Sequence, residues 1–173
     1  MRSITAGICG ITLAAAIALA AQIDPPLSKG PGYFHSSQSM QQKGAALLAE
    51  APKSNGIAEQ RLETYPGSYT QLTVRTASGT GELHQRWQDN FFVVSGEATV
   101  ITGGHVVDPK ETKPGEIRGT RVDGGESHVL HKGDVLHVAA NTPHQTILAP
   151  GQSFVYFVLK VEEPTARLMP ATK

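Results

Sequence analysis

The sequence predicts an all-β fold: a single jelly-roll β-barrel of short strands, preceded by one N-terminal helix. Its length of 173 residues fits one domain with extensions. From residue 57 onward, apolar and polar residues alternate in short runs, which is the period of a half-buried strand. Turn signals such as Pro66-Gly67, Gly103-Gly104 and Gly124-Gly125 separate these runs. About ten short strands with a turn roughly every eight to twelve residues are typical of a jelly roll.

Residues 1–21 have the pattern of a secretory signal peptide. Arg2 supplies the positive charge, a largely apolar run extends from Ile4 to Ile17, and Ala18-Leu19-Ala20 is a small-x-small cleavage signal. We therefore expect a cleaved signal and a periplasmic or secreted protein, with an uncleaved membrane anchor as the alternative. The only cysteine, Cys9, lies in this segment, so the mature chain is expected to have no disulfide and no thiolate site.

Residues 22–56 are predicted to form a leader and one helix. Pro25-Pro26 and Gly30-Pro31-Gly32 break regular structure in the leader. The helix is expected at about residues 38–51, capped by Ser36 or Ser37 and ended by Pro52. We expect it to pack on the outside of the barrel, or across the barrel of a partner subunit.

Residues 57–163 are predicted to form the barrel, and residues 164–173 a C-terminal tail. Residues 58–65 are expected to form an edge strand. In the next strand, residues 69–76, alternation places Leu72 and Val74 on one face and Thr73 and Arg75 on the other. In the last strand the same rule gives Tyr156 and Phe157 opposite faces, so only one of them can face the interior.

The charge balance argues against nucleic acid as a partner. Fifteen Lys and Arg residues match fifteen Asp and Glu residues, for a formal net charge of zero, so no basic surplus indicates nucleic-acid binding. After signal cleavage we expect no stable membrane insertion. The Gly-Gly pairs are hairpin turns rather than phosphate loops, because neither is followed by a helical pattern.

Two stretches carry the chemistry of this chain. The first, residues 82–96, reads ELHQRWQDNFFVVSG, and the second, residues 133–144, reads GDVLHVAANTPH. Glu82 and His84 point the same way on one strand, Asp89 opens the following apolar run, and His144 ends the second stretch. If the stretches lie side by side, two imidazoles and one or two carboxylates converge. That set suits a divalent transition metal such as manganese, iron, zinc or nickel.

Three residues near the first histidine have open roles. Glu82 and Asp89 compete for the carboxylate position, and both together would make a site of two histidines and two carboxylates. Arg86 shares the parity of Glu82 and His84, so it could point inward and bind an anionic substrate group; the alternative is a surface arginine at the strand end.

The two stretches resemble the paired motifs of the cupin superfamily. The first cupin motif has a His-x-His pair, then a Glu, then a Gly seven residues later. Glu82 and His84 fall at the histidine positions, Asp89 at the Glu and Gly96 at the Gly.

The second cupin motif is G-x5-P-x-G-x2-H-x3-N, and this chain has the corresponding spacing. The corresponding residues are Gly133, Ala139, Asn141, His144 and Leu148. The resemblance covers residues 69–161, about half of the chain.

The resemblance implies a cupin barrel that binds one divalent metal through Glu82, His84, Asp89 and His144, together with a small organic ligand. By the same resemblance the protein would form a homodimer. The alternatives are a metal-dependent enzyme of the dioxygenase or isomerase type, and a metal-free degenerate cupin that serves as a binding module.

Overall fold

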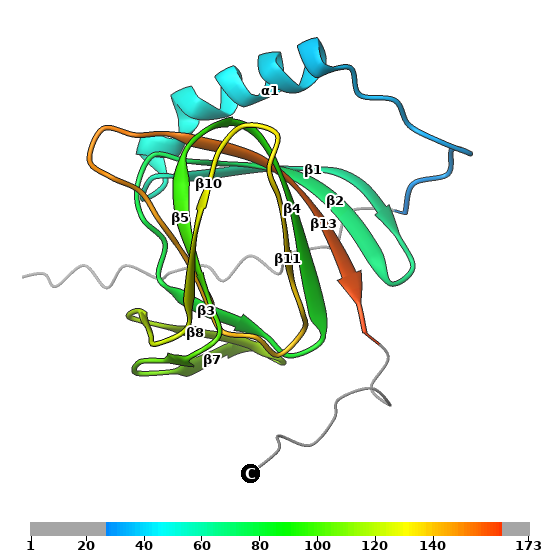
Figure 1. Cartoon of the computed structure of the whole chain (residues 1–173). Coiled ribbons are helices and arrows are strands. Elements are labelled where there is room, and N and C mark those ends of the chain that lie inside the picture. Colours follow the sequence, from blue (N-terminus) through cyan, green and yellow to red (C-terminus); the bar gives the residue numbers. More distant parts are fainter. Residues whose placement is uncertain (1–26, 164–173) are drawn as a thin grey trace, which may run out of the picture.

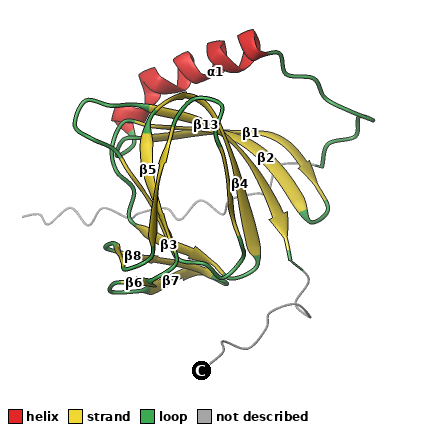
Figure 2. Ribbon diagram, viewed as in Figure 1, coloured by secondary structure: helices red, strands yellow, loops and turns green. Residues whose placement is uncertain are grey.

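The computed structural model describes residues 27–163 and shows two facing antiparallel β-sheets with one helix on the outside (Figures 1 and 2). The predicted all-β class with a single N-terminal helix is confirmed. The expected signal peptide and C-terminal tail lie outside the described residues. Between residues 27 and 163, the structure contains no helix that is long and apolar enough to span a membrane.

The strands form two large sheets and one small one. The first has five strands in the order β1-β2-β13-β4-β11, the second has six in the order β10-β5-β12-β3-β8-β7, and β6 pairs with β9. The elements, in chain order, are α1 (Ser37–Glu50), the short 3-10 helix η1 (Ala51–Lys53), β1 (Ile57–Tyr65), β2 (Ser68–Arg75), β3 (Gly81–His84), β4 (Trp87–Gly96), β5 (Ala98–Thr102), β6 (His105–Val106), β7 (Lys110–Lys113), β8 (Glu116–Gly119), β9 (Val122–Asp123), β10 (Glu126–Leu130), β11 (Val135–Val138), β12 (His144–Ile147) and β13 (Phe154–Glu162).

Helix α1 begins and ends where its capping residues predict. The Ser36 hydroxyl accepts a hydrogen bond from the Ser39 amide at 3.1 Å, which satisfies one of the amides left open in the first turn. The helix gives way to η1, which contains Pro52. Its buried Met40 packs with apolar residues of β2 and β13, so α1 covers the outer face of the five-stranded sheet (Figure 1).

Side chains along β2 alternate between the outer face of the sheet, which α1 covers, and the inner face, which points into the barrel. Leu72 and Val74 are fully buried under α1, while the opposite face of the strand carries Thr73 and Arg75, both of them buried too. In β13, Tyr156 belongs to the core between the sheets, whereas Phe157 packs with the helix-side cluster. Polar side chains are therefore buried inside the barrel, where they form the site described below.

Two positions of the motifs need an unusual backbone. Gly96 has φ +82°, and a Cβ added there would lie 1.9 Å from the Ser153 carbonyl oxygen, so only glycine fits. Asn141 has φ +61°, a left-handed conformation that asparagine tolerates better than most residues. Its amide donates to the His84 carbonyl at 2.7 Å, which ties the turn before His144 to the end of β3.

The leader is fastened to the edge strand β1. The Ser28 amide donates to the Thr64 carbonyl at 2.7 Å, and the Thr64 amide donates back to the Ser28 hydroxyl at 3.1 Å. Further along the leader, His35 Nε2 lies 2.6 Å from Oε1 of the buried Glu63. These contacts hold the beginning of the described chain against the end of β1, and Leu27 lines the interior cavity.

Candidate metal centre

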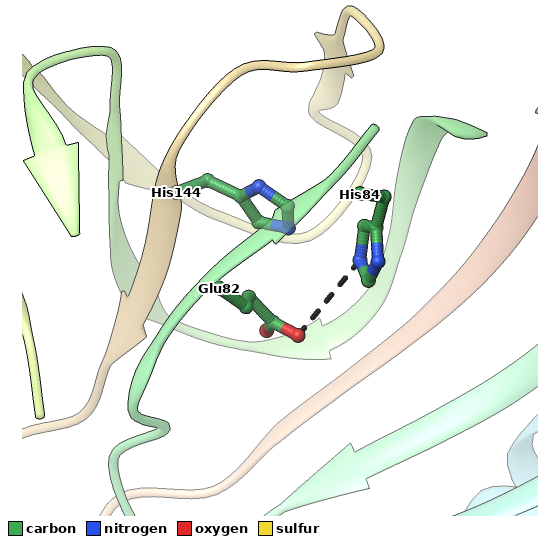
Figure 3. A group of neighbouring side chains, drawn as sticks. All are labelled: Glu82, His84 and His144. Carbon is green, nitrogen blue, oxygen red and sulfur yellow. Dashed lines mark ion pairs between the residues drawn. The ribbon is translucent and has the colours of Figure 1, made fainter. Parts of the chain in front are cut away.

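The two stretches singled out by their sequence lie side by side. Strand β12 pairs with β3 so that His144 is directly opposite Glu82. His84 follows on β3, and Asp89 reaches the same point from β4 in the facing sheet. Figure 3 shows the side chains of Glu82, His84 and His144 directed toward one another; one ligand atom from each lies within 4.8 Å of the others. The sequence predicted two imidazoles with one or two carboxylates, and the structure brings both carboxylates to the imidazoles.

Each histidine is held through Nδ1. His84 Nδ1 lies 2.6 Å from Glu116 Oε2, and His144 Nδ1 lies 3.0 Å from the Thr142 carbonyl oxygen. Because a carboxylate and a carbonyl oxygen can only accept, each Nδ1 must carry the proton and donate. In the neutral imidazoles, each Nε2 therefore has its lone pair directed into the site, and this is how protein partners orient metal-binding histidines.

Asp89 lies between the two free ring nitrogens. Its Oδ2 is 3.5 Å from His84 Nε2 and 3.7 Å from His144 Nε2. These separations exceed the usual length of a hydrogen bond, about 2.7–3.2 Å. His144 is only 1 % exposed, and its Nε2 forms no hydrogen bond with any residue between 27 and 163. A buried polar atom without a partner is rare, and a bound ion or an ordered water is a common partner for such an atom.

Three of the separations between the proposed ligand atoms fit a shared metal ion. Four ligands at about 2.0–2.1 Å from a tetrahedral ion lie about 3.4 Å from one another. The 3.5 and 3.7 Å separations at Asp89, and the 3.8 Å between Glu82 Oε2 and His84 Nε2, are close to that value. Two imidazoles and carboxylate oxygens suit the transition metals named above.

Glu82 and His84 each lie opposite a charged residue on the neighbouring strand β8. In the β3–β8 register, Glu82 pairs with Arg118 and His84 with Glu116. Arg118 forms an ion pair with Glu82, whose other oxygen lies 3.4 Å from a terminal nitrogen of Arg75. Of the two carboxylates, Glu82 is thus already neutralised by arginines.

Asp89 has a lysine as its cross-strand partner. Lys160 is opposite Asp89 in the β13–β4 register, and its Nζ lies 2.6 Å from Asp89 Oδ1. Lys160 occupies only one of the two oxygens, so Oδ2 remains directed at the imidazoles. Sequence reasoning missed Lys160, although its parity with Tyr156 in β13 is a signal that it faces inward.

Arg86 is not part of this arrangement. Strand β3 ends at His84 and the chain bends at residues 85–86, so alternation along β3 does not extend to Arg86. Its guanidinium lies 2.8 Å from Glu162, and the side chain is half exposed. Arg75 and Arg118 line the interior cavity in its place.

Burial and mutual attraction shift the pKa values within the site. Burial raises the pKa of Asp89, but His144, His84 and Lys160 outweigh it and hold that pKa well below its usual range. Burial lowers the pKa of His144. Burial also opposes protonation of His84, yet Asp89 and Glu116 outweigh it, so the pKa of His84 is raised.

A cavity of about 630 Å³ opens beside the four residues. Both sheets contribute to its wall, and Glu82, His84 and Asp89 are part of the lining. Tyr69 and Trp87, with ring centroids 5.2 Å apart, form an aromatic side of the wall. The volume falls in the range of about 300–1,000 Å³ that is usual for small-molecule sites.

Comparison with known proteins gives structural likeness only. No family model and no curated protein matches the chain. Among solved structures, the chain is similar to KdgF from Halomonas sp., at 17% identity over 65% of this chain and 84% of that one, with a TM-score of 0.47. It is also similar to the Cnp3 cupin domain of Schizosaccharomyces pombe, at 8% identity over 62% of this chain and 65% of that one, with a TM-score of 0.47.

A third similar structure is an uncharacterized conserved protein with a double-stranded beta-helix domain from Klebsiella pneumoniae, at 14% identity over 62% of this chain and 78% of that one, with a TM-score of 0.46. Because every one of these TM-scores is below 0.5, we base the function on this chain's own residues.

Proposed function

We propose that this protein binds one divalent transition metal inside its barrel. His84 and His144 supply Nε2, Asp89 supplies Oδ2, and Glu82 is the fourth ligand. The observation that carries the proposal is the Nε2 atom of His144, which is buried, directed at Asp89 and His84, and without a hydrogen bond to any described residue. A bound metal would give that atom a partner, and a buried polar atom left without one costs free energy.

A small organic ligand would occupy the neighbouring cavity and complete the coordination of the metal. The cavity supports this because its wall includes three of the four proposed ligands. A metal-dependent enzyme of the dioxygenase or isomerase type is the second candidate, and the same cavity favours it. In either case the metal would act as a Lewis acid toward an oxygen of the bound molecule.

Metal content of the mature protein, residues 22–173, tests the proposal. The protein is purified without chelator or immobilised nickel and analysed by elemental mass spectrometry, beside His84→Ala, His144→Ala, Asp89→Asn and Glu82→Gln. We expect near-stoichiometric metal in the wild type and little in either histidine variant. The matched control is His137→Ala, because His137 is exposed on β11 and hydrogen-bonded to Asn90.

The carboxylate variants rank the two acidic ligands. We expect Asp89→Asn to lose more metal than Glu82→Gln, because Asp89 Oδ2 lies near both imidazoles while Glu82 is held by two arginines. If the wild type stays metal-free even after reconstitution with manganese, iron, zinc and nickel salts, the proposal is wrong.

We also propose that the protein is exported to the periplasm or secreted, and that it forms a homodimer. The residue pattern of segment 1–21 supports export, and the resemblance to single-domain cupins supports the dimer. Mass spectrometry of the protein recovered from the cell envelope and the medium should show a mature N-terminus near residue 21 or 22. Light scattering at micromolar concentration should give twice the mass of the mature chain; a monomer would contradict the dimer.

A further inference from the structure

The interior cavity contains two arginines that converge on one carboxylate. Arg75 lies on β2 and Arg118 on β8, in facing sheets, and both reach Glu82. Arg75 is 8 % exposed, and its Nε donates to the Tyr156 hydroxyl at 3.0 Å, which fixes the plane of the guanidinium. Two arginines around one anion, one of them buried and the other 39% exposed, are unusual, since a buried charge normally has its own partner.

These arginines have more donors than the surrounding protein uses. A guanidinium has five N–H donors in a planar fork. Within residues 27–163, the contacts of Arg75 are the Tyr156 hydroxyl and one oxygen of Glu82. Arg118 contacts Glu82 and, more distantly, Glu116 at 3.7 Å. Both side chains line the cavity, so their other donors are within reach of a molecule bound there.

The charge of the cavity favours the same kind of molecule. Its lining carries five basic side chains and four carboxylates, a formal excess of one positive charge. Binding of a divalent metal beside neutral imidazoles would raise the excess to three. An excess of positive charge in the lining of a partly enclosed cavity favours an anionic ligand.

We infer that Arg75 and Arg118 form a carboxylate-binding subsite, and that the small molecule bound in this cavity is an organic acid. The guanidinium fork matches a carboxylate in a bidentate arrangement, which a lysine cannot provide. The aromatic pair of Tyr69 and Trp87 lines the same cavity and would contact the carbon skeleton of the acid. The inference deepens the proposed metal site by naming the class of its ligand.

Calorimetric titration of the metal-loaded mature protein tests the subsite. The probes are malate and gluconate, each beside an uncharged counterpart, malamide and glucose. We expect saturable binding of at least one acid and none of its neutral counterpart. Arg118→Gln should weaken binding by about tenfold to a hundredfold, because a charge-assisted pair is lost. Arg118→Lys should recover only part of the affinity, because it restores the charge without the fork.

The control is Arg121→Gln, an exposed arginine that pairs with Asp123 and does not line the cavity. It should bind the acid as the wild type does. Equal binding of acid and neutral counterpart, an unchanged affinity in Arg118→Gln, or no acid binding up to about 10 mM would each overturn the inference. The side chain of Arg118 is 39% exposed, so its replacement should leave the fold intact, which circular dichroism verifies.

Metal analysis of the same samples separates this inference from the proposed function. Stoichiometric metal without acid binding would overturn the carboxylate subsite and leave the metal site standing. Acid binding that depends on Arg118, in a protein that stays metal-free even after reconstitution, would establish the subsite and overturn the metal proposal.

Discussion

Replacing Glu116 is expected to weaken metal binding although Glu116 is not itself a ligand. Its Oε2 accepts from His84 Nδ1 at 2.6 Å, which holds the ring with Nε2 directed at the site. Such partners of metal-binding histidines typically contribute about tenfold to a hundredfold in affinity. That range corresponds to about 1.4–2.8 kcal/mol.

The structure allows the size of the effect to be graded between two variants. Glu116→Gln keeps an oxygen that can accept from Nδ1 but removes the charge, so we expect a loss near tenfold. Glu116→Ala removes the acceptor entirely, and we expect a loss near a hundredfold. The Glu116 side chain is 24% exposed, so neither substitution leaves a large cavity in the core.

The assay is competition for zinc or manganese against a chromophoric chelator at pH 7.5, with Glu50→Gln as the control. Glu50 is exposed on α1, where it pairs only with the nearby Lys53 among the described residues. NMR titration of the metal-free protein gives a second readout: the pKa of His84 should fall in Glu116→Gln, because Glu116 helps to raise it. Wild-type affinity in both Glu116 variants would refute the positioning role.

Three further outcomes follow from the structure. The pKa of His84 is raised above the usual 6.5, so protons should begin to compete with the metal at a higher pH than they would for a free imidazole. Below that pH, metal affinity should fall about tenfold per pH unit. An affinity that stays flat from about pH 8 to 5 would contradict this. Gly96→Ala should lower the free energy of unfolding by about 2 kcal/mol or more, since its Cβ would clash with the Ser153 carbonyl; an unchanged urea midpoint would contradict it. Leu72→Ala should cost about 2–5 kcal/mol in the same assay, because Leu72 is fully buried under α1; a loss below about 1 kcal/mol would mean that α1 packs loosely.

The parts predicted from the sequence are those that depend on local pattern. Alternation predicted Leu72 and Val74 on one face of the strand and Arg75 on the other, and the structure has the first face under α1. The helix was placed within a residue of Ser37–Glu50, because a serine cap and a proline mark its ends. The motif spacing predicted that Glu82 and His144 meet, and they are cross-strand partners.

The residues that sequence reasoning missed depend on the pairing of distant strands. Glu116 reaches His84 because β8 pairs with β3, and Lys160 reaches Asp89 because β13 pairs with β4. A one-residue slip of either register would send these side chains to the opposite face, so no local pattern specifies the pairing. Arg86 was predicted to share the inward face of His84, because the two residues have the same parity along a strand. Strand β3 ends at His84, so this alternation does not extend to Arg86.

The site is built from side chains of both sheets, so it forms only when the whole barrel is folded. Both histidines and Glu116 come from the six-stranded sheet, whereas Asp89 and Lys160 come from the five-stranded sheet. The two sheets must therefore pack at the right separation before Asp89 can approach both Nε2 atoms. A metal bound there would link the sheets directly and add its binding free energy to folding, since the unfolded chain has no preformed site. Lys160 neutralises a carboxylate that would otherwise be buried without a cation at that oxygen, so folding of the barrel does not require a metal to compensate this charge.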